Sequence, residues 1–135
     1  MAVDFNRLRV LIVEDNDYSA KFIRTVLGNL GIYQVFTARN GKDALRFVDS
    51  AEEMINFIIC DWNMPHMTGY EFLCQVRSVD PNIPFLMVTA RATVDAVKAA
   101  QDKGVSAYIA KPYKPEELER KVVALAKSLN PSRLN

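Results

Sequence analysis

Five side chains able to do chemistry stand directly after short apolar runs of this sequence. They are three carboxylates, a hydroxyl and an ammonium: Glu14, Asp15, Asp61, Thr89 and Lys111. A short apolar run is typical of a strand buried on both faces of a parallel sheet. The carboxyl ends of such strands share one edge of the sheet, where open α/β folds bind ligands. The five side chains are therefore expected to meet at one site.

The residue types predict the chemistry of that site. Three carboxylates in one pocket repel one another and stay ionised together only beside a cation. Oxygen ligands without imidazole or thiolate select Mg²⁺ or a similar divalent ion, which leaves positions open for phosphate oxygens. An ammonium and a hydroxyl opposite the ion hold further phosphoryl oxygens. Asp61, at the end of the central run, is then able to attack phosphorus and form an acyl phosphate.

Apolar runs alternate with helical patterns along the whole chain. The runs occupy residues 10–13, 35–38, 57–60, 85–88 and 107–110. A length of 135 residues indicates one domain, 1–135. The alternation predicts an α/β fold with a doubly wound, five-stranded parallel sheet and helices on both faces.

Five helices are predicted between and after these runs. The first, second and fourth span about residues 17–29, 40–50 and 93–103. The third begins at residue 68 and the fifth at residue 115. Thr68 and Glu71 form a capping-box pattern at the start of the third helix. The apolar residues of the fourth helix, Val94, Val97 and Ala100, are small. We therefore expect this helix to bury little area and to be loosely held.

Composition narrows the classes of partner. Seventeen basic residues balance 16 acidic ones, and no basic block is present, so neither nucleic acid nor an anionic membrane is an expected partner. No apolar run approaches the roughly 20 residues that span a bilayer, and the first nine residues lack an apolar signal segment. We expect a cytoplasmic protein. Cys60 and Cys74 lack metal-ligand spacing and are expected to be reduced and buried.

Four motifs, in this order, resemble the receiver domain of two-component response regulators. They are Val-Glu-Asp-Asn-Asp at 13–17, Asp-Trp-Asn-Met-Pro at 61–65 with Gly69 after it, Val-Thr-Ala at 88–90, and Tyr-Ile-Ala-Lys-Pro at 108–112. The second motif is similar to that of the chemotaxis-type single-domain members. The resemblance covers about residues 7–130. It implies a flavodoxin-like fold with strand order 2-1-3-4-5.

The resemblance implies a role for each residue on the acidic side of the site. Asp61 is expected to accept the phosphoryl group, and Asp15 and Asp61 to bind Mg²⁺ directly. The backbone carbonyl of Asn63 is expected to join this set, while Glu14 acts through a bound water. Arg91 and Asn63 occupy positions that tune dephosphorylation.

The remaining residues are expected to bind the phosphoryl group or to change conformation when it is bound. Lys111 would bridge to the phosphoryl group, and Thr89 would hydrogen-bond to it. The peptide between Lys111 and Pro112 is expected to be cis. Tyr108 would be the switch aromatic, turning inward as Thr89 moves toward the phosphate.

The implied function is phosphorelay signalling by a stand-alone receiver. A histidine kinase or phosphotransfer protein would supply the phosphoryl group, and no enzymatic turnover is expected. The output surface would be the face made by the fourth helix, the fifth strand and the fifth helix. It would bind a target protein in trans, and the chain would be a monomer or a phosphorylation-dependent dimer.

Three alternatives share parts of this pattern. A haloacid-dehalogenase-like phosphatase has an Asp-x-Asp-x-Thr motif similar to residues 15–19, but its last acidic motif follows the lysine, whereas Asp61 precedes Lys111. A flavodoxin-like electron carrier needs a phosphate loop after the first strand, where Glu14 and Asp15 would repel phosphate. A pseudo-receiver that only binds partners is disfavoured because every chemical residue is present.

Overall fold

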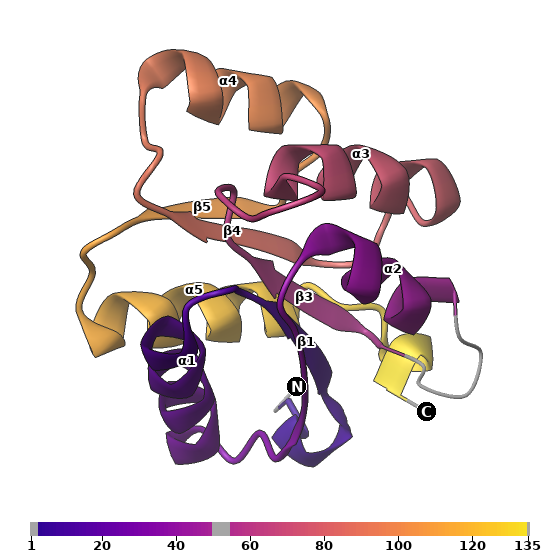
Figure 1. Ribbon diagram of the computed structural model, residues 1–135. Helices are drawn as coiled ribbons and strands as arrows, with labels where there is room; N and C mark the ends of the chain where they lie inside the picture. Colours follow the sequence, from indigo (N-terminus) through magenta and orange to yellow (C-terminus); the bar gives the residue numbers. More distant parts are fainter. Residues whose placement is uncertain (1–2, 50–54, 135) are drawn as a thin grey trace.

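The computed structural model describes residues 3–49 and 55–134. Five parallel strands form one sheet in the order β2-β1-β3-β4-β5, which confirms the predicted fold and strand order (Figure 1). The strands are β1 (Arg9–Val13), β2 (Gln34–Ala38), β3 (Phe57–Cys60), β4 (Phe85–Thr89) and β5 (Ala107–Ala110). Each coincides with a predicted apolar run to within one residue at either end.

The α-helices also lie where the sequence predicts them. They are α1 (Asp17–Asn29), α2 (Gly41–Asp49), α3 (Gly69–Val79), α4 (Val94–Asp102) and α5 (Pro115–Lys127), with short 3₁₀ helices η1 (Phe5–Arg7) and η2 (Pro131–Leu134) at the two ends. The predicted capping box of Thr68 and Glu71 is present at α3. Ser50, the predicted end of the second helix, lies outside the described residues. Within the part of the chain that the structure describes, no helix has the length and apolar character needed to cross a bilayer.

The sheet is covered on both faces, as Figure 1 shows. Alternate residues of β1 point to opposite sides, so Val10 and Ile12 pack in one cluster with residues of α1 and α5. Leu11 and Val13 pack in a second cluster with residues of α2, α3 and α4. Burial on both faces explains why the central strands are continuous apolar runs and not alternating ones.

One expectation about burial agrees with the structure, and one is wrong in detail. The buried residues of α4 are the small Ala96 and Ala100, and Val94 is 82% exposed, so this helix buries little area, as expected. Cys60 is buried, whereas Cys74 is only partly buried, and both are free thiols.

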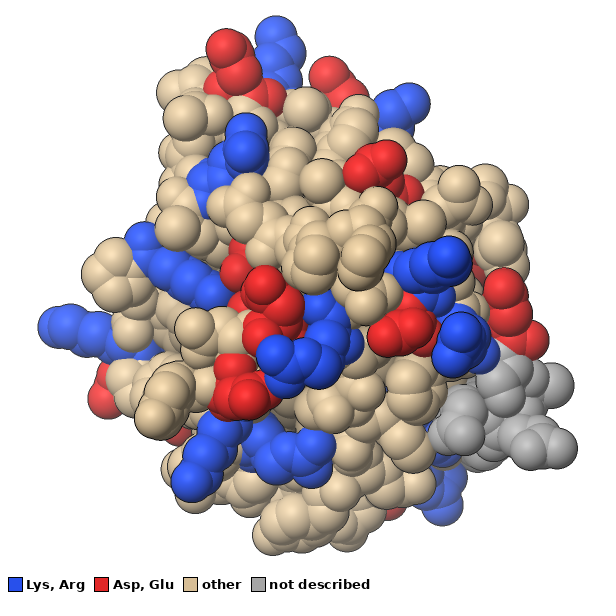
Figure 2. All heavy atoms as spheres, in the orientation of Figure 1, with Lys and Arg blue, Asp and Glu red and all other residues tan. Residues whose placement is uncertain are grey.

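Charge is dispersed on the face drawn in Figure 2, where basic and acidic side chains alternate without a continuous basic patch. This distribution agrees with a net charge of +1. It provides no single-sign field on that face to attract a polyanion.

The buried side chain of Asn56, just before β3, forms hydrogen bonds with segments near both ends of the chain. Its amide nitrogen donates to the carbonyls of Arg7 at 3.0 Å and Arg133 at 3.1 Å, and its carbonyl accepts from the backbone N–H of Arg9 at 2.7 Å. An amide with both halves bonded in this way specifies one arrangement of η1, β1 and η2.

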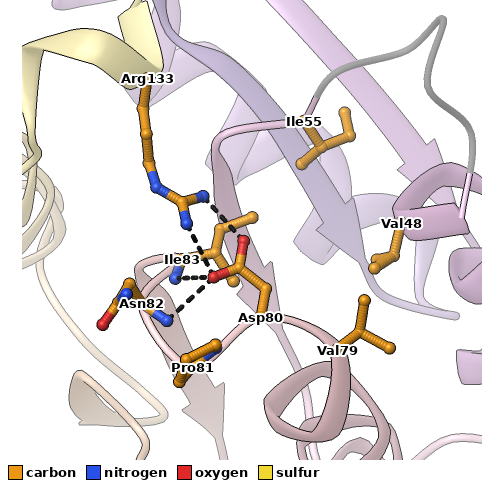
Figure 3. A pocket seen from close by; sticks show the side chains of 8 residues that line it. All are labelled: Val48, Ile55, Val79, Asp80, Pro81, Asn82, Ile83 and Arg133. Atoms are coloured by element: carbon orange, nitrogen blue, oxygen red, sulfur yellow. Dashed lines mark hydrogen bonds and ion pairs between the residues drawn. The ribbon is translucent and has the colours of Figure 1, made fainter.

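Arg133 of η2 also forms a two-bond ion pair with Asp80, which follows α3 (Figure 3). The two nitrogen–oxygen distances are 2.7 and 2.8 Å. Burial by itself raises the pKa of Asp80, because it disfavours the charged carboxylate. Hydrogen bonds from Arg133 and from two backbone N–H groups lower the pKa by more, so it lies below its usual value. The pair borders a cavity of about 350 Å³, whose lining includes Ile55 and Ile83 near the amino ends of β3 and β4.

Gly69 starts α3 in close contact with the end of β3. A Cβ atom at this position would lie 1.9 Å from the carbonyl oxygen of Asp61 and 2.9 Å from the Cα of Trp62. The N–H of Gly69 donates to the Trp62 carbonyl at 2.8 Å. Only glycine fits this approach, because the atoms that a side chain would meet belong to the backbone.

The Asp80–Arg133 pair predicts a pH-dependent contribution to stability. Because the folded pKa of Asp80 is below its unfolded value, the contribution is present above roughly pH 4 and is lost as pH falls through the folded pKa. Asp80→Asn is expected to lower the unfolding free energy at pH 7 by on the order of 1 kcal/mol. Urea unfolding at pH 7 and pH 3 measures the unfolding free energies of Asp80→Asn and the unaltered protein. The difference between these two free energies is expected to be smaller at pH 3 than at pH 7. A difference that is the same at both values contradicts the assignment.

The contact at Gly69 predicts a destabilising substitution with a matched control. Gly69→Ala is expected to cost about 1–3 kcal/mol of unfolding free energy, because the backbone of residues 61 and 62 must move. Gly28→Ala in α1 meets no atom within 4 Å and is expected to be neutral or stabilising by up to about 1 kcal/mol. Thermal and urea unfolding compare the two, and equal effects would show that the close approach at Gly69 has no energetic consequence.

Candidate functional site

Three of the five predicted side chains meet at the carboxyl edge of the sheet. The ammonium of Lys111 lies 2.8 Å from Oε2 of Glu14 and 2.9 Å from Oδ2 of Asp61. Glu14 and Asp61 follow Val13 and Cys60, which are partners in the β1–β3 ladder. The register of the sheet therefore brings the two carboxylates side by side, and β5 supplies the cation from two strands away.

Alternation along the strands explains why these three side chains share one side of the sheet. Glu14, Asp61 and Lys111 continue the residue sets that pack toward α1 and α5. Thr89 has the opposite parity and continues the set that packs toward α2, α3 and α4, as does Tyr108. The predicted acceptor, Asp61, and the cation of Lys111 therefore lie on one side of the sheet. The two predicted switch residues, Thr89 and Tyr108, lie on the other side.

Burial makes the charges of the site depend on one another. Glu14 is 4% exposed and Asp61 is 8% exposed. Burial raises the pKa of Glu14, although its hydrogen bond with Lys111 opposes this effect. Burial by itself lowers the pKa of Lys111, because it disfavours the charged ammonium. The bonds of the ammonium to Glu14 and Asp61 raise the pKa by more, so it lies above its usual value. The lysine therefore remains charged at neutral pH.

Backbone N–H groups hold the second oxygen of each carboxylate. The N–H of Asn63 donates to Oδ1 of Asp61 at 3.1 Å, and the N–H of Asn16 donates to Oε1 of Glu14 at 3.1 Å. Ser19 of α1 places its hydroxyl 3.5 Å from the Lys111 ammonium, a contact that the sequence did not predict. These contacts fix the direction of both carboxylates.

Asp15 is not brought into the same cluster. Its carbonyl accepts from a guanidinium N–H of Arg39 at 2.9 Å, and Arg39 also forms an ion pair with Asp17. Among residues 3–49 and 55–134, no group of three His, Cys, Asp or Glu side chains is placed to hold a metal ion. The structure thus assembles two of the three carboxylates expected to meet.

The donor types nevertheless fit Mg²⁺. Glu14 and Asp61 offer hard oxygen ligands, and they already face a common cation. The neighbouring thiol of Cys60 is not a competing ligand, because burial raises its pKa well above its usual value. That thiol donates to the carbonyl of Asp61 at 3.0 Å. A site of this composition favours Mg²⁺ over Zn²⁺.

Thr89 and Tyr108 meet at Arg91, in the loop between β4 and α4. The hydroxyl of Thr89, fully buried, accepts from the backbone N–H of Arg91 at 3.2 Å. The hydroxyl of Tyr108 donates to the carbonyl of the same residue. The expected cis peptide between Lys111 and Pro112 is confirmed.

An apolar hollow lies beside Lys111. It has a volume of about 560 Å³ and is lined by Tyr18, Ser19, Phe22, Ala90, Lys111, Pro112 and Tyr113. Tyr18 is 87% exposed, and the rings of Phe22 and Tyr113 lie 5.7 Å apart. Burial raises the pKa of Tyr113 to about 12, so its hydroxyl stays neutral. Exposed aromatic side chains next to a reactive group are typical of a surface that binds a partner.

Known proteins share this sequence and fold. The family model of the response regulator receiver domain matches residues 10–123. Chemotaxis protein CheY of Pseudomonas aeruginosa is 34% identical over 125 residues, covering 91% of this chain and 99% of that protein. Chemotaxis protein CheY1 of Helicobacter pylori strain 26695 is 32% identical, covering 85% and 94%.

Solved structures agree with the sequence relatives. A CheY-like receiver domain protein from Methanospirillum hungatei superposes with a TM-score of 0.82 at 27% identity, covering 90% of this chain and 94% of that one. Chemotaxis response regulator CheY4 of Vibrio cholerae superposes with a TM-score of 0.78 at 32% identity, covering 87% and 98%. By sequence, fold and site, this chain belongs to the response regulator receiver domain family of two-component signalling and is CheY-like.

Proposed function

We propose that this receiver accepts a phosphoryl group on Asp61 from the phosphohistidine of a histidine kinase or phosphotransfer protein. One observation carries the proposal: a carboxylate at the end of the central strand, 8% exposed, has a lysine ammonium 2.9 Å from one of its oxygens. That arrangement supplies positive charge where a phosphoryl group would arrive.

In the proposed reaction an Asp61 carboxylate oxygen forms a bond to phosphorus in line with the donor nitrogen. The phosphorus–nitrogen bond breaks, its electron pair returns to the donor imidazole, and an aspartyl phosphate remains. The Asn63 N–H, already 3.1 Å from Oδ1, keeps the carboxylate oriented so that Oδ2 faces Lys111. Positioning and charge neutralisation are the main sources of rate acceleration in phosphoryl transfer.

Glu14, Asp15, Asp61 and the carbonyl of Asn63 are the groups that would hold Mg²⁺. When bound, the ion would neutralise charge on the phosphoryl oxygens. Lys111 would move from its two carboxylates to a phosphoryl oxygen, and Thr89 would donate its hydroxyl to another. The ammonium is suited to this exchange because its bonds to Glu14 and Asp61 hold it charged at the site beforehand.

The donor would cover the hollow beside Lys111. Tyr18 and Phe22 of α1 and Tyr113 before α5 present apolar surface next to the reacting carboxylate. A donor protein that places its histidine at Asp61 would bury these rings, which stabilises the encounter through removal of apolar area from water.

The proposed output is a protein contact in the cytoplasm. Thr89, Tyr108 and α4 would rearrange after phosphorylation and change the face made by α4, β5 and α5, to which a target binds in trans. The receiver would act as a monomer or a phosphorylation-dependent dimer, and it would be phosphorylated once per cycle without catalytic turnover of small phosphomonoesters.

Labelling with acetyl phosphate tests the acceptor directly. In the presence of Mg²⁺ the protein is expected to incorporate up to one acid-stable, hydroxylamine-sensitive phosphoryl group per chain. Asp61→Asn is expected to lower incorporation by at least about 100-fold, because the amide oxygen is a weak nucleophile. Asp102→Asn, at the exposed end of α4, serves as the control and should label normally. Equal labelling of Asp61→Asn and the control would remove Asp61 from its role, and steady release of phosphate from phosphomonoesters would favour a phosphatase.

Replacing Lys111 separates phosphorylation from switching. Lys111→Ala is still expected to be phosphorylated by acetyl phosphate. Its amide NMR shifts in α4 and β5, however, are expected not to change when beryllofluoride is added. The reason is that no cation remains to leave Glu14 and Asp61 for the phosphoryl group. Lys98→Ala, which removes an exposed lysine of α4, should respond as the unaltered protein does. An unchanged response in Lys111→Ala would contradict the coupling role.

A further inference from the structure

Both switch residues are hydrogen-bonded to the backbone of one loop residue. Arg91 donates its N–H to the hydroxyl of Thr89 at 3.2 Å, and its carbonyl accepts from the hydroxyl of Tyr108. A displacement of the Arg91 backbone therefore alters the surroundings of both side chains at once.

The side chain of Arg91 connects that loop to the turn after β3. Its Nε donates to Oδ1 of Asn63 at 3.3 Å, and its guanidinium lies 5.5 Å from the centre of the Trp62 ring. Trp62 in turn stacks on Tyr70 of α3, with ring centres 5.1 Å apart and planes inclined by 20°. A guanidinium placed over an indole face is attracted by the ring and fixed in orientation by it.

These contacts form a continuous path from the carboxylate of Asp61 to Tyr108. The N–H of Asn63 donates to Asp61, the side-chain oxygen of Asn63 accepts from Arg91, and the carbonyl of Arg91 accepts from Tyr108. The ring of Trp62 packs against the guanidinium of Arg91 in this path. The path runs beside the one through Thr89 and joins it at Arg91.

We propose that Arg91 is a positioning residue that couples the state of Asp61 to Tyr108 through its planar guanidinium, held between Asn63 and Trp62. The inference rests on the proposed function, because it assigns the route by which a modified Asp61 reaches the output face. A change at Asp61 or Asn63 moves the guanidinium, and the backbone of Arg91 then moves the hydroxyl partner of Tyr108. Thr89 and Lys111 remain the groups that bind the phosphoryl group.

The first test uses the protein without any ligand. Trp62 is the only tryptophan of the sequence, so its fluorescence reports the stack alone. Arg91→Ala uncovers one face of the ring and is expected to increase acrylamide quenching about 2-fold. Lys98→Ala is the matched control for loss of an exposed cation of this region and should leave quenching unchanged. Quenching that is equal in Arg91→Ala and the control would contradict the stack.

The second test measures coupling, with Mg²⁺ and beryllofluoride as the probe. Fluorine NMR reports whether beryllofluoride binds, and the ring resonances of Tyr108 report whether the switch responds. In Arg91→Ala beryllofluoride is expected to bind, while the shift of the Tyr108 signals falls at least about 3-fold. Arg91→Lys keeps the charge but lacks the planar group, and it is expected to lose coupling to a similar extent.

The outcomes separate this inference from the function on which it rests. Full Tyr108 shifts in Arg91→Ala, with beryllofluoride bound, overturn the coupling role and leave Asp61 as the acceptor. Full coupling in Arg91→Lys would show that charge alone is sufficient and would overturn the role of the planar group. Absence of beryllofluoride binding in the unaltered protein overturns the proposed function, and this inference with it.

Discussion

The ammonium of Lys111 lies between two buried carboxylates, and the state of the site depends on that contact. Both carboxylates accept a hydrogen bond from this one ammonium. Burial raises the pKa of Glu14, whereas the bonds to the two carboxylates raise the pKa of Lys111 above its usual value, so the lysine stays charged at neutral pH. In the proposed reaction, a phosphoryl group on Asp61 would offer the ammonium a more highly charged partner.

The parallel sheet makes this contact possible and also places the proposed acceptor and the proposed switch residues on opposite sides. Because side chains alternate along each strand, Asp61 and Lys111 extend from the side of α1 and α5. Thr89 and Tyr108 extend from the side of α2, α3 and α4. Arg91 contacts Thr89, Asn63 and Tyr108, and it provides the route that we propose between the two sides. The buried face of α4, Ala96 and Ala100, is small, so little burial of apolar area holds this helix in place.

Much of this arrangement could be predicted from the sequence, because it follows from local patterns. Strand ends, the capping box at Thr68 and the alignment of Glu14, Asp61 and Lys111 depend on periodicity and on the geometry of parallel sheets. Contacts between side chains distant in the sequence could not be predicted in this way. Examples are the stack of Arg91 on Trp62 and the ion pair that joins Arg133 to Asp80.

Details within single elements also depend on the fold. Val94 lies on the exposed side of α4, because the helical rotation places Ala96 and Ala100 inward. Glu14 follows β1 with the parity of Val10 and Ile12, which directs it toward the side of α1 and α5, where Lys111 meets it.

A crystal structure with Mg²⁺ and beryllofluoride would show directly whether Asp61 is the acceptor and whether Lys111 leaves its two carboxylates. Beryllium is expected to be bonded to an Asp61 carboxylate oxygen, with the Lys111 ammonium within hydrogen-bond distance of a fluorine and no longer bridging Glu14 and Asp61. An adduct on another residue, or a Lys111 that still joins both carboxylates beside the bound group, would contradict this expectation.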